Sequence, residues 1–190
     1  MIRQRLPRQG RHRPPAGFTL TELMVIIAII GILSGITISN SLSTWRDAQV
    51  SDLALQLAGW LEQVSRSPES SGGSCTVTFA NGITGGITLN NGAQLASVSP
   101  ASCSPQPSFT VPTRFGNQQI AAGASAASVV FTPRNAITAS TDIQVRLALL
   151  NQAPVRCVRL SAVLGLIRLG RNDASSSATT ACPDASFETI

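Results

Sequence analysis

A long apolar run near the amino end limits what this chain can fold into more than any other part of the sequence. Residues 18–38 read FTLTELMVIIAIIGILSGITI, in which Glu22 is the one charged side chain. As a helix that rises about 1.5 Å per residue, this run is long enough to cross the roughly 30 Å hydrocarbon core of a bilayer. We therefore expect residues 18–38 to form the transmembrane half of a longer helix.

The charges before and after this run predict its orientation. The first 17 residues carry five arginines: Arg3, Arg5, Arg8, Arg11 and Arg13. After Gly17 the chain has nine Arg, no Lys and nine acids, so its formal charge is zero. Basic residues next to a membrane helix stay on the cytoplasmic side. We expect a single-pass inner-membrane protein with a cytoplasmic amino end and a periplasmic globular domain.

The junction between the basic and apolar segments differs from that of a secretory signal. A secretory signal has its small-residue cleavage site after the apolar run, whereas here the junction, AGFTLTE at residues 16–22, precedes it. This pattern resembles the signal of type IV prepilins, which is a short basic leader ending in Gly, then Phe, then Glu four residues later. A plain membrane anchor with a chance Gly-Phe-Thr-Leu is the alternative.

The resemblance to type IV prepilins implies roles in processing and assembly. Residues 1–17 would be a leader, removed between Gly17 and Phe18 by a prepilin peptidase that also methylates the Phe18 amine. A carboxylate in the apolar layer is costly unless it is paired, and the family pairs the residue at Glu22 with the new amine of a neighbouring subunit. The implied partners are other pilin or pseudopilin subunits, the peptidase/N-methyltransferase, the inner-membrane assembly platform and membrane lipid.

The helical pattern continues beyond the apolar run, over residues 39–68. Its apolar side chains recur at helical spacing along one stripe: Leu53, Leu57, Trp60, Leu61 and Val64. Pro68 and the Ser- and Gly-rich residues after it should end the helix. We expect this amphipathic half to pack its stripe on a sheet, with Trp60 as a core residue.

Residues 75–170 have the pattern of a β-rich domain. Short β-prone runs alternate with turn residues such as Asn81-Gly82 and Asn90-Asn91-Gly92. The predicted strands cover residues 75–80, 86–90, 94–98, 108–111, 128–132, 142–149, 155–161 and 164–169. A long helix packed on an antiparallel sheet is a pilin-like α+β fold. Residues 171–190, rich in Ser, Thr and Ala, are expected to be a mobile tail that Cys182 can tie down.

Four cysteines follow the membrane segment: Cys75, Cys103, Cys157 and Cys182. An even number on the outer side of a membrane fits two disulfides, for which three pairings are possible. We favour Cys75–Cys103 with Cys157–Cys182 because each closes a short loop, and buried free thiols are the alternative. A metal site is not expected, because no CxxC pair is present and the one histidine, His12, lies in the leader.

Several carboxy-terminal runs resemble the GspH/FimT group of pseudopilins and minor pilins. These runs are SVVFTPRN at 128–135, the strand at 142–149, RCVRLS at 156–161 and GLIR at 165–168. The group shows "v-F-t-P-r-G" and "r-v-S-x-x-G-r-i-r" there, and Asn135 stands where it often has Gly. The resemblance implies a minor pilin or pseudopilin of a type IV pilus or type II secretion filament.

The same resemblance raises nucleic acid as a partner. In the DNA-uptake members a Gly-Arg-x-Arg motif helps bind DNA, but residues 165–168 read GLIR, so the first Arg is missing. Arg159, Arg168 and Arg171 could still form a small basic patch. Duplex binding depends on clustered cations, and the acids balance the arginines after Gly17. A DNA-binding minor pilin is therefore an alternative function, and a major pilin is another.

The sequence contains no recognisable catalytic arrangement. Once His12 leaves with the leader, Ser-His-Asp and Cys-His arrangements cannot form. No Gly-rich phosphate loop with a GK[ST] ending is present, and the carboxylates form no recognisable acid–base pair. We expect a structural protein without a cofactor, which is a substrate of the peptidase and not an enzyme.

Overall fold

The computed structural model describes most of the chain: residues 17–134, 136–162 and 164–189. Within these ranges the side chains are described except at residues 35–43, 69–71 and 188–189. Apart from Gly17, the predicted leader lies outside the described residues, and so does Asn135. The chain divides into two compact units after Leu42, and each is treated by itself. The fold is α+β with antiparallel sheets, as predicted.

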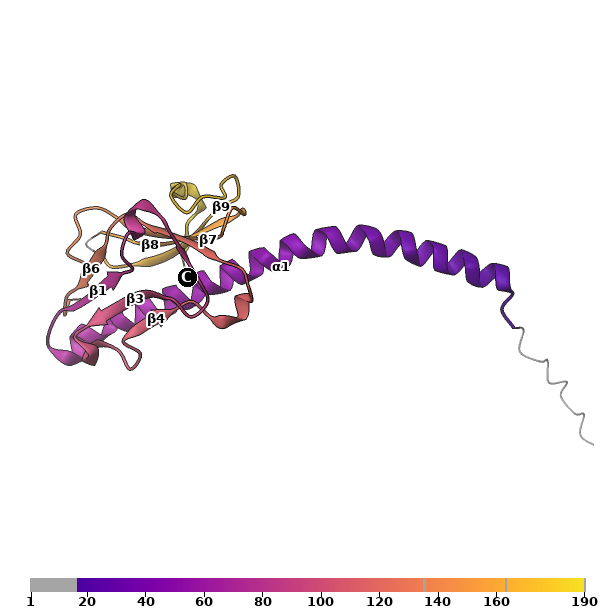
Figure 1. Ribbon diagram of the computed structural model, residues 1–190. Coiled ribbons are helices and arrows are strands. Elements are labelled where there is room, and N and C mark those ends of the chain that lie inside the picture. Colours follow the sequence, from indigo (N-terminus) through magenta and orange to yellow (C-terminus); the bar gives the residue numbers. More distant parts are fainter. Residues whose placement is uncertain (1–16, 135, 163, 190) are drawn as a thin grey trace, which may run out of the picture. The chain divides into compact units, whose positions relative to one another are not determined.

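Helix α1 covers Leu20–Ser71 and is the one α-helix in the described part of the chain (Figure 1). The sequence predicted its end near Pro68, but the helix continues to Ser71. Proline removes one hydrogen-bond donor and crowds the preceding turn. The last helical turn, which ends at Ser71, nevertheless forms around Pro68. Gly72 ends the helix instead: its φ is +68°, and its N–H donates to the Pro68 carbonyl at 3.0 Å.

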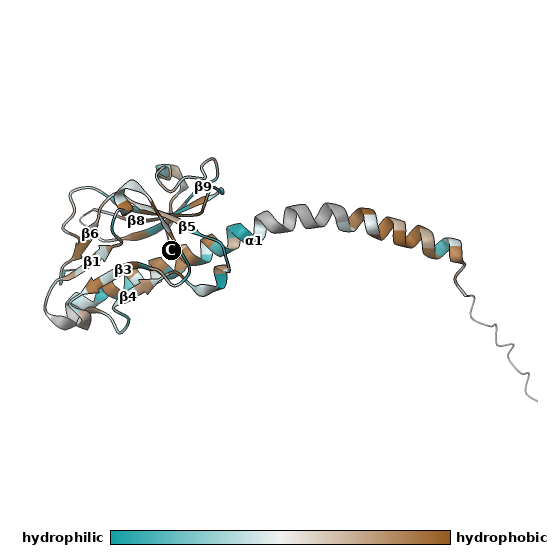
Figure 2. Ribbon diagram, in the orientation of Figure 1, coloured by the Kyte–Doolittle hydropathy of each residue, from teal (hydrophilic) through white to brown (hydrophobic). Residues whose placement is uncertain are grey.

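In the first unit, the described apolar side chains of α1 are exposed. They run from Leu20 to Leu33, and Figure 2 shows this part of the helix as mostly hydrophobic. Among the residues that the structure describes, we find no helix with the length and apolar character needed to cross a bilayer. The predicted membrane segment also includes residues 35–38, whose side chains lie outside the described set.

In the second unit, α1 buries one stripe of apolar side chains in the core. The buried residues include the predicted stripe and extend it: Val50, Leu53, Ala54, Leu57, Ala58, Trp60, Leu61 and Val64. Trp60 is 5% exposed, its Nε1 donates to the Gln106 carbonyl at 2.9 Å, and its ring centroid lies 5.9 Å from that of Phe109. Trp60 is thus a core residue whose polar atom is also satisfied.

A four-stranded antiparallel sheet forms one part of the β domain. Its strand order is β4-β3-β1-β6. The strands are β1 (Cys75–Phe79), β3 (Gln94–Ser99), β4 (Ser108–Thr110) and β6 (Ser128–Phe131). All four lie within one residue of predicted strands. The Cys75–Cys103 disulfide links β1 to the short 3-10 helix η2 (Ala101–Cys103).

A six-stranded antiparallel sheet forms the other part, in the order β10-β9-β8-β7-β5-β2. Its strands are β2 (Ile87–Leu89), β5 (Ile120–Ala124), β7 (Ile143–Leu149), β8 (Val155–Leu160), β9 (Ile167–Asn172) and β10 (Glu188–Thr189). The sequence did not predict β5 or β10. Because β5 reads IAAGA, it carries few of the β-branched and aromatic residues that favour strands.

The two faces of the six-stranded sheet pack differently. Val158 and Leu160 belong to the main core with α1, whereas Val155 and Cys157 form a separate cluster with Ala148 and Cys182. Side chains alternate between faces along a strand, so residues 155, 157 and 159 of β8 share the face turned away from the main core. We call this the outer face.

A segment that we name the C-terminal cover, residues 173–187, packs on the outer face. The Cys157–Cys182 disulfide fastens it to β8, and Arg146 of β7 donates to the Thr179 carbonyl at 2.7 Å. A Cβ on Gly170 would come within 2.6 Å of the Phe187 ring. The predicted tail 171–190 therefore begins inside β9 and continues as a segment with specific contacts to the sheet.

Gly123→Ala should destabilise the domain, because the added Cβ would collide with the Ala178 carbonyl of the cover. Overpacking of this kind costs about 1–3 kcal/mol. Gly59→Ala is the matched control, since no described atom outside the helix backbone lies within 4 Å of its Cβ position on α1. That change should stabilise by up to about 1 kcal/mol. Urea unfolding measures the stability of both variants. A Gly123→Ala protein as stable as wild type would contradict the close contact between Gly123 and Ala178.

Candidate functional site

Helix α1 begins with a reciprocal pair of hydrogen bonds between Thr19 and Glu22. The Glu22 backbone N–H donates to Thr19 Oγ1 at 3.3 Å, and the Thr19 backbone N–H donates to Glu22 Oε2 at 3.1 Å. The Thr19 hydroxyl also donates to Glu22 Oε2 at 3.2 Å. This is a capping box, in which Thr19 is the N-cap and Glu22 the third helical residue.

The capping box gives Glu22 a partner inside its own chain. A carboxylate in the first turn also interacts favourably with the positive end of the helix dipole. The sequence reasoning considered Glu22 only as an assembly residue and missed Thr19, although the spacing Thr-x-x-Glu at residues 19–22 is a known helix-start signature. Glu22 therefore starts the helix in addition to any role between subunits.

The predicted cleavage site lies just before this helix start. Gly17 and Phe18 are outside α1, Gly17 is exposed, and the Phe18 side chain is 78% exposed. Backbone outside a helix keeps its N–H and C=O groups free of helical hydrogen bonds. Gly17 and Phe18 therefore lie in exposed backbone outside the helix.

The arginines predicted as a basic patch do not share one surface. Arg159 of β8 and Arg168 of β9 are directly opposed across the two strands, so they lie on the outer face. Arg171 is opposed to Arg156, which belongs to the other face of the sheet. Because neighbouring residues of a strand point to opposite sides, the three predicted arginines cannot form a single patch.

Arg159 is held in a network of internal contacts. Its Nε donates to Asp142 Oδ2 at 2.6 Å, its Nη1 donates to Asp184 Oδ1 at 2.8 Å, and its guanidinium lies 5.0 Å from the Phe187 ring centroid. The backbone N–H of Ala162 donates to Asp142 Oδ1 at 2.6 Å. That bond, followed by Arg159, lowers the pKa of Asp142. Arg159 therefore connects the sheet to the C-terminal cover.

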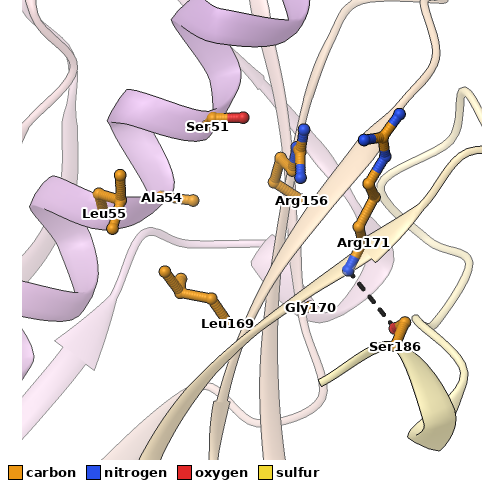
Figure 3. A pocket seen from close by; sticks show the side chains of 8 residues that line it. All are labelled: Ser51, Ala54, Leu55, Arg156, Leu169, Gly170, Arg171 and Ser186. Carbon is orange, nitrogen blue, oxygen red and sulfur yellow. Dashed lines mark hydrogen bonds between the residues drawn. The ribbon is translucent and has the colours of Figure 1, made fainter. Parts of the chain in front are cut away.

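Arg171 lines a groove beside α1, shown in Figure 3. The groove has a volume of about 360 Å³ and is lined by Ser51, Ala54, Leu55, Arg156, Leu169, Gly170, Arg171 and Ser186. Arg156 Nη2 lies 2.5 Å from Asp47 Oδ1, and Arg171 is ion-paired with Asp173, which raises the pKa of Arg171. An anion would have to displace these carboxylates to bind here.

Asp142→Asn should remove stability that depends on pH. Because the pKa of Asp142 is lowered in the fold, its contribution is present above the unfolded value of about 3.9 and is lost as the pH falls through the folded value. We expect Asp142→Asn to lower the free energy of unfolding by about 1–2 kcal/mol at pH 7. Well below both pKa values, where the carboxyl group is protonated in the folded and unfolded chain, the variant should be about as stable as wild type.

The matched control for this change is Asp173→Asn, whose ion pair with Arg171 is more exposed. Exposed pairs contribute little, so we expect a change below about 1 kcal/mol. Urea unfolding at several pH values measures both variants, and an Asp142→Asn loss that is equal at all pH values would contradict the role of the charge.

Comparison with known protein families finds a match at the amino end. The family model described as the prokaryotic N-terminal methylation motif matches residues 13–38. No curated protein and no solved structure matches the chain. The matched residues include Gly17, Phe18 and Glu22, and the match supports a type IV prepilin-like protein.

Proposed function

We propose that this chain is a minor pilin or pseudopilin, a structural subunit of a type IV pilus or type II secretion filament. The observation that carries this proposal is the methylation motif at residues 13–38, which contains the predicted cleavage site and Glu22. The GspH/FimT-like runs in the β domain favour a minor subunit over a major one. The role is structural, as the motif indicates, and the implied enzyme is the peptidase that processes the chain.

In this proposal the precursor is anchored in the inner membrane by residues 18–38, with the leader in the cytoplasm and the β domain in the periplasm. Prepilin peptidase cuts after Gly17, and the new amine of Phe18 is methylated. The exposed apolar side chains of the first unit then need cover, because such a large apolar surface is unfavourable in water. Lipid supplies it before assembly, and the helices of neighbouring subunits supply it in the filament.

In this proposal Glu22 links cleavage of the precursor to assembly of the filament. Cleavage places a positive amine one residue before Thr19, at the end of α1 where the helix dipole is already positive. The capping box keeps the Glu22 carboxylate at this same end. It can therefore offset the amine of its own chain or pair with that of a neighbour, and the second arrangement would set the axial spacing of subunits.

DNA uptake remains a second hypothesis with little support from the fold. Its candidate residues lie on two faces, and Arg159 and Arg171 are ion-paired. Phosphate binding relies on clustered, available cations. A gel-shift titration of the full chain with duplex DNA tests this hypothesis. The hypothesis holds only if binding weakens as the salt concentration rises and is weaker for Arg168→Ala than for wild type.

Gly17→Ala should prevent cleavage, because the proposed recognition requires Gly before the cut. The expected result is a precursor that keeps the leader, detected as a larger band and by Met1 as the amino-terminal residue. Gly10→Ala, also in the leader, is the matched control and should be processed normally. Normal processing of the Gly17→Ala chain would contradict the assigned cleavage site.

Glu22→Gln separates the two roles of Glu22. Gln can still complete a capping box but carries no charge, so the chain should be inserted and cleaved yet be poorly incorporated into sheared filaments. Thr19→Ala is the matched control, because it weakens the cap and keeps the charge, and it should assemble far better. Wild-type incorporation of Glu22→Gln would rule out the charge pairing.

A further inference from the structure

A pocket lined by carboxamide side chains lies at one end of the six-stranded sheet. It has a volume of about 320 Å³ and is lined by Asn90, Asn91, Gly116, Asn117, Gln118 and Gln119. Every lining residue except Gly116 is Asn or Gln, and none of the six is charged or aromatic. We call this the carboxamide pocket.

The sheet brings these residues together from two loops. Leu89, the last residue of β2, is paired with Ile120, the first residue of β5. The segment after β2 and the segment before β5 therefore emerge side by side. Two hydrogen bonds join them: Gln119 Nε2 donates to Asn90 Oδ1 at 2.9 Å, and Asn91 Nδ2 donates to the Gly116 carbonyl. The pocket walls are thus fixed to each other.

Two side-chain oxygens of the lining residues lack a hydrogen-bond partner among the described residues. Asn91 Oδ1 and Gln118 Oε1 are buried and accept no hydrogen bond from the described residues. A buried acceptor without a donor is energetically unfavourable. The side chains of Asn90, Asn117 and Gln119 are exposed around them. A ligand in the pocket therefore meets the exposed carboxamides of these three residues, and it reaches the two buried oxygens only if the side chains of Asn91 and Gln118 turn outward.

The lining selects the chemical class of that ligand. A carboxamide presents an acceptor and two donors in one plane, and a hydroxyl group can both donate and accept, so neighbouring hydroxyls match neighbouring carboxamides. The lining offers no cation for a phosphate, no carboxylate for a metal ion and no aromatic ring for a base. We propose that the carboxamide pocket binds a neutral saccharide.

This binding is separate from the proposed filament role. All lining residues belong to the second unit, and none lies on α1. A chain that fails to assemble could therefore still bind saccharide, and a chain that binds no saccharide could still assemble.

The test uses the purified full chain in a zwitterionic detergent, because a sugar-based detergent would compete. Saturation-transfer NMR is recorded with the methyl glycosides of glucose, galactose, mannose and N-acetylglucosamine. We expect transfer to at least one of them, and an affinity at least tenfold lower for Gln118→Leu and Gln119→Leu. Gln94→Leu, an exposed carboxamide on β3 outside the pocket, is the matched control and should bind as wild type does.

Circular dichroism first confirms that each variant is folded. If Gln118→Leu does not fold, Gln119→Leu decides, because its side chain is exposed. The proposal is overturned if wild type gives no transfer to any of the four glycosides, or if the folded pocket variants bind as tightly as Gln94→Leu.

Discussion

The buried stripe of α1 is the interaction on which the β domain depends. Leu53, Leu57 and Leu61 are fully buried in one core that also contains Val77 of the four-stranded sheet and Val145 of the six-stranded sheet. A sheet with one apolar face must cover it with another element, and here both sheets contribute to the core that the helix completes. The α1 stripe therefore stabilises both sheets at once.

The sequence predicted the regular parts of this fold because periodicity reports burial. The α1 stripe and eight strands were anticipated, and the structure contains the two disulfides that close the shorter loops. Strand β5 was missed because it carries few β-branched or aromatic residues, and the close approach of Ala178 to Gly123 leaves no local sequence pattern. Arg159 and Arg171 lie on opposite faces of the sheet because of the strand register. That register follows from pairing across the sheet and could not be read from the sequence.

The amino end and the β domain support the function unequally. The motif at residues 13–38 is specific because it combines a Gly-Phe junction with an acid in an apolar run, and its match supports a type IV prepilin-like protein. The Thr-x-x-Glu spacing of the capping box lies in the same residues, but the prediction treated Glu22 only as an assembly residue. The carboxamide pocket could not be predicted, since its two loops meet only through the pairing of β2 with β5.

The C-terminal cover has a consequence for the order in which the domain can mature. Cys75 and Cys103 are both synthesised well before Cys157, so their bond can close while the rest of the chain is still emerging. Cys157 lies on β8, inside the six-stranded sheet, and its partner Cys182 is made 25 residues later. The C-terminal cover is made after strands β5, β7, β8 and β9, and without it the outer face of the sheet and the Cys157 thiol would be uncovered.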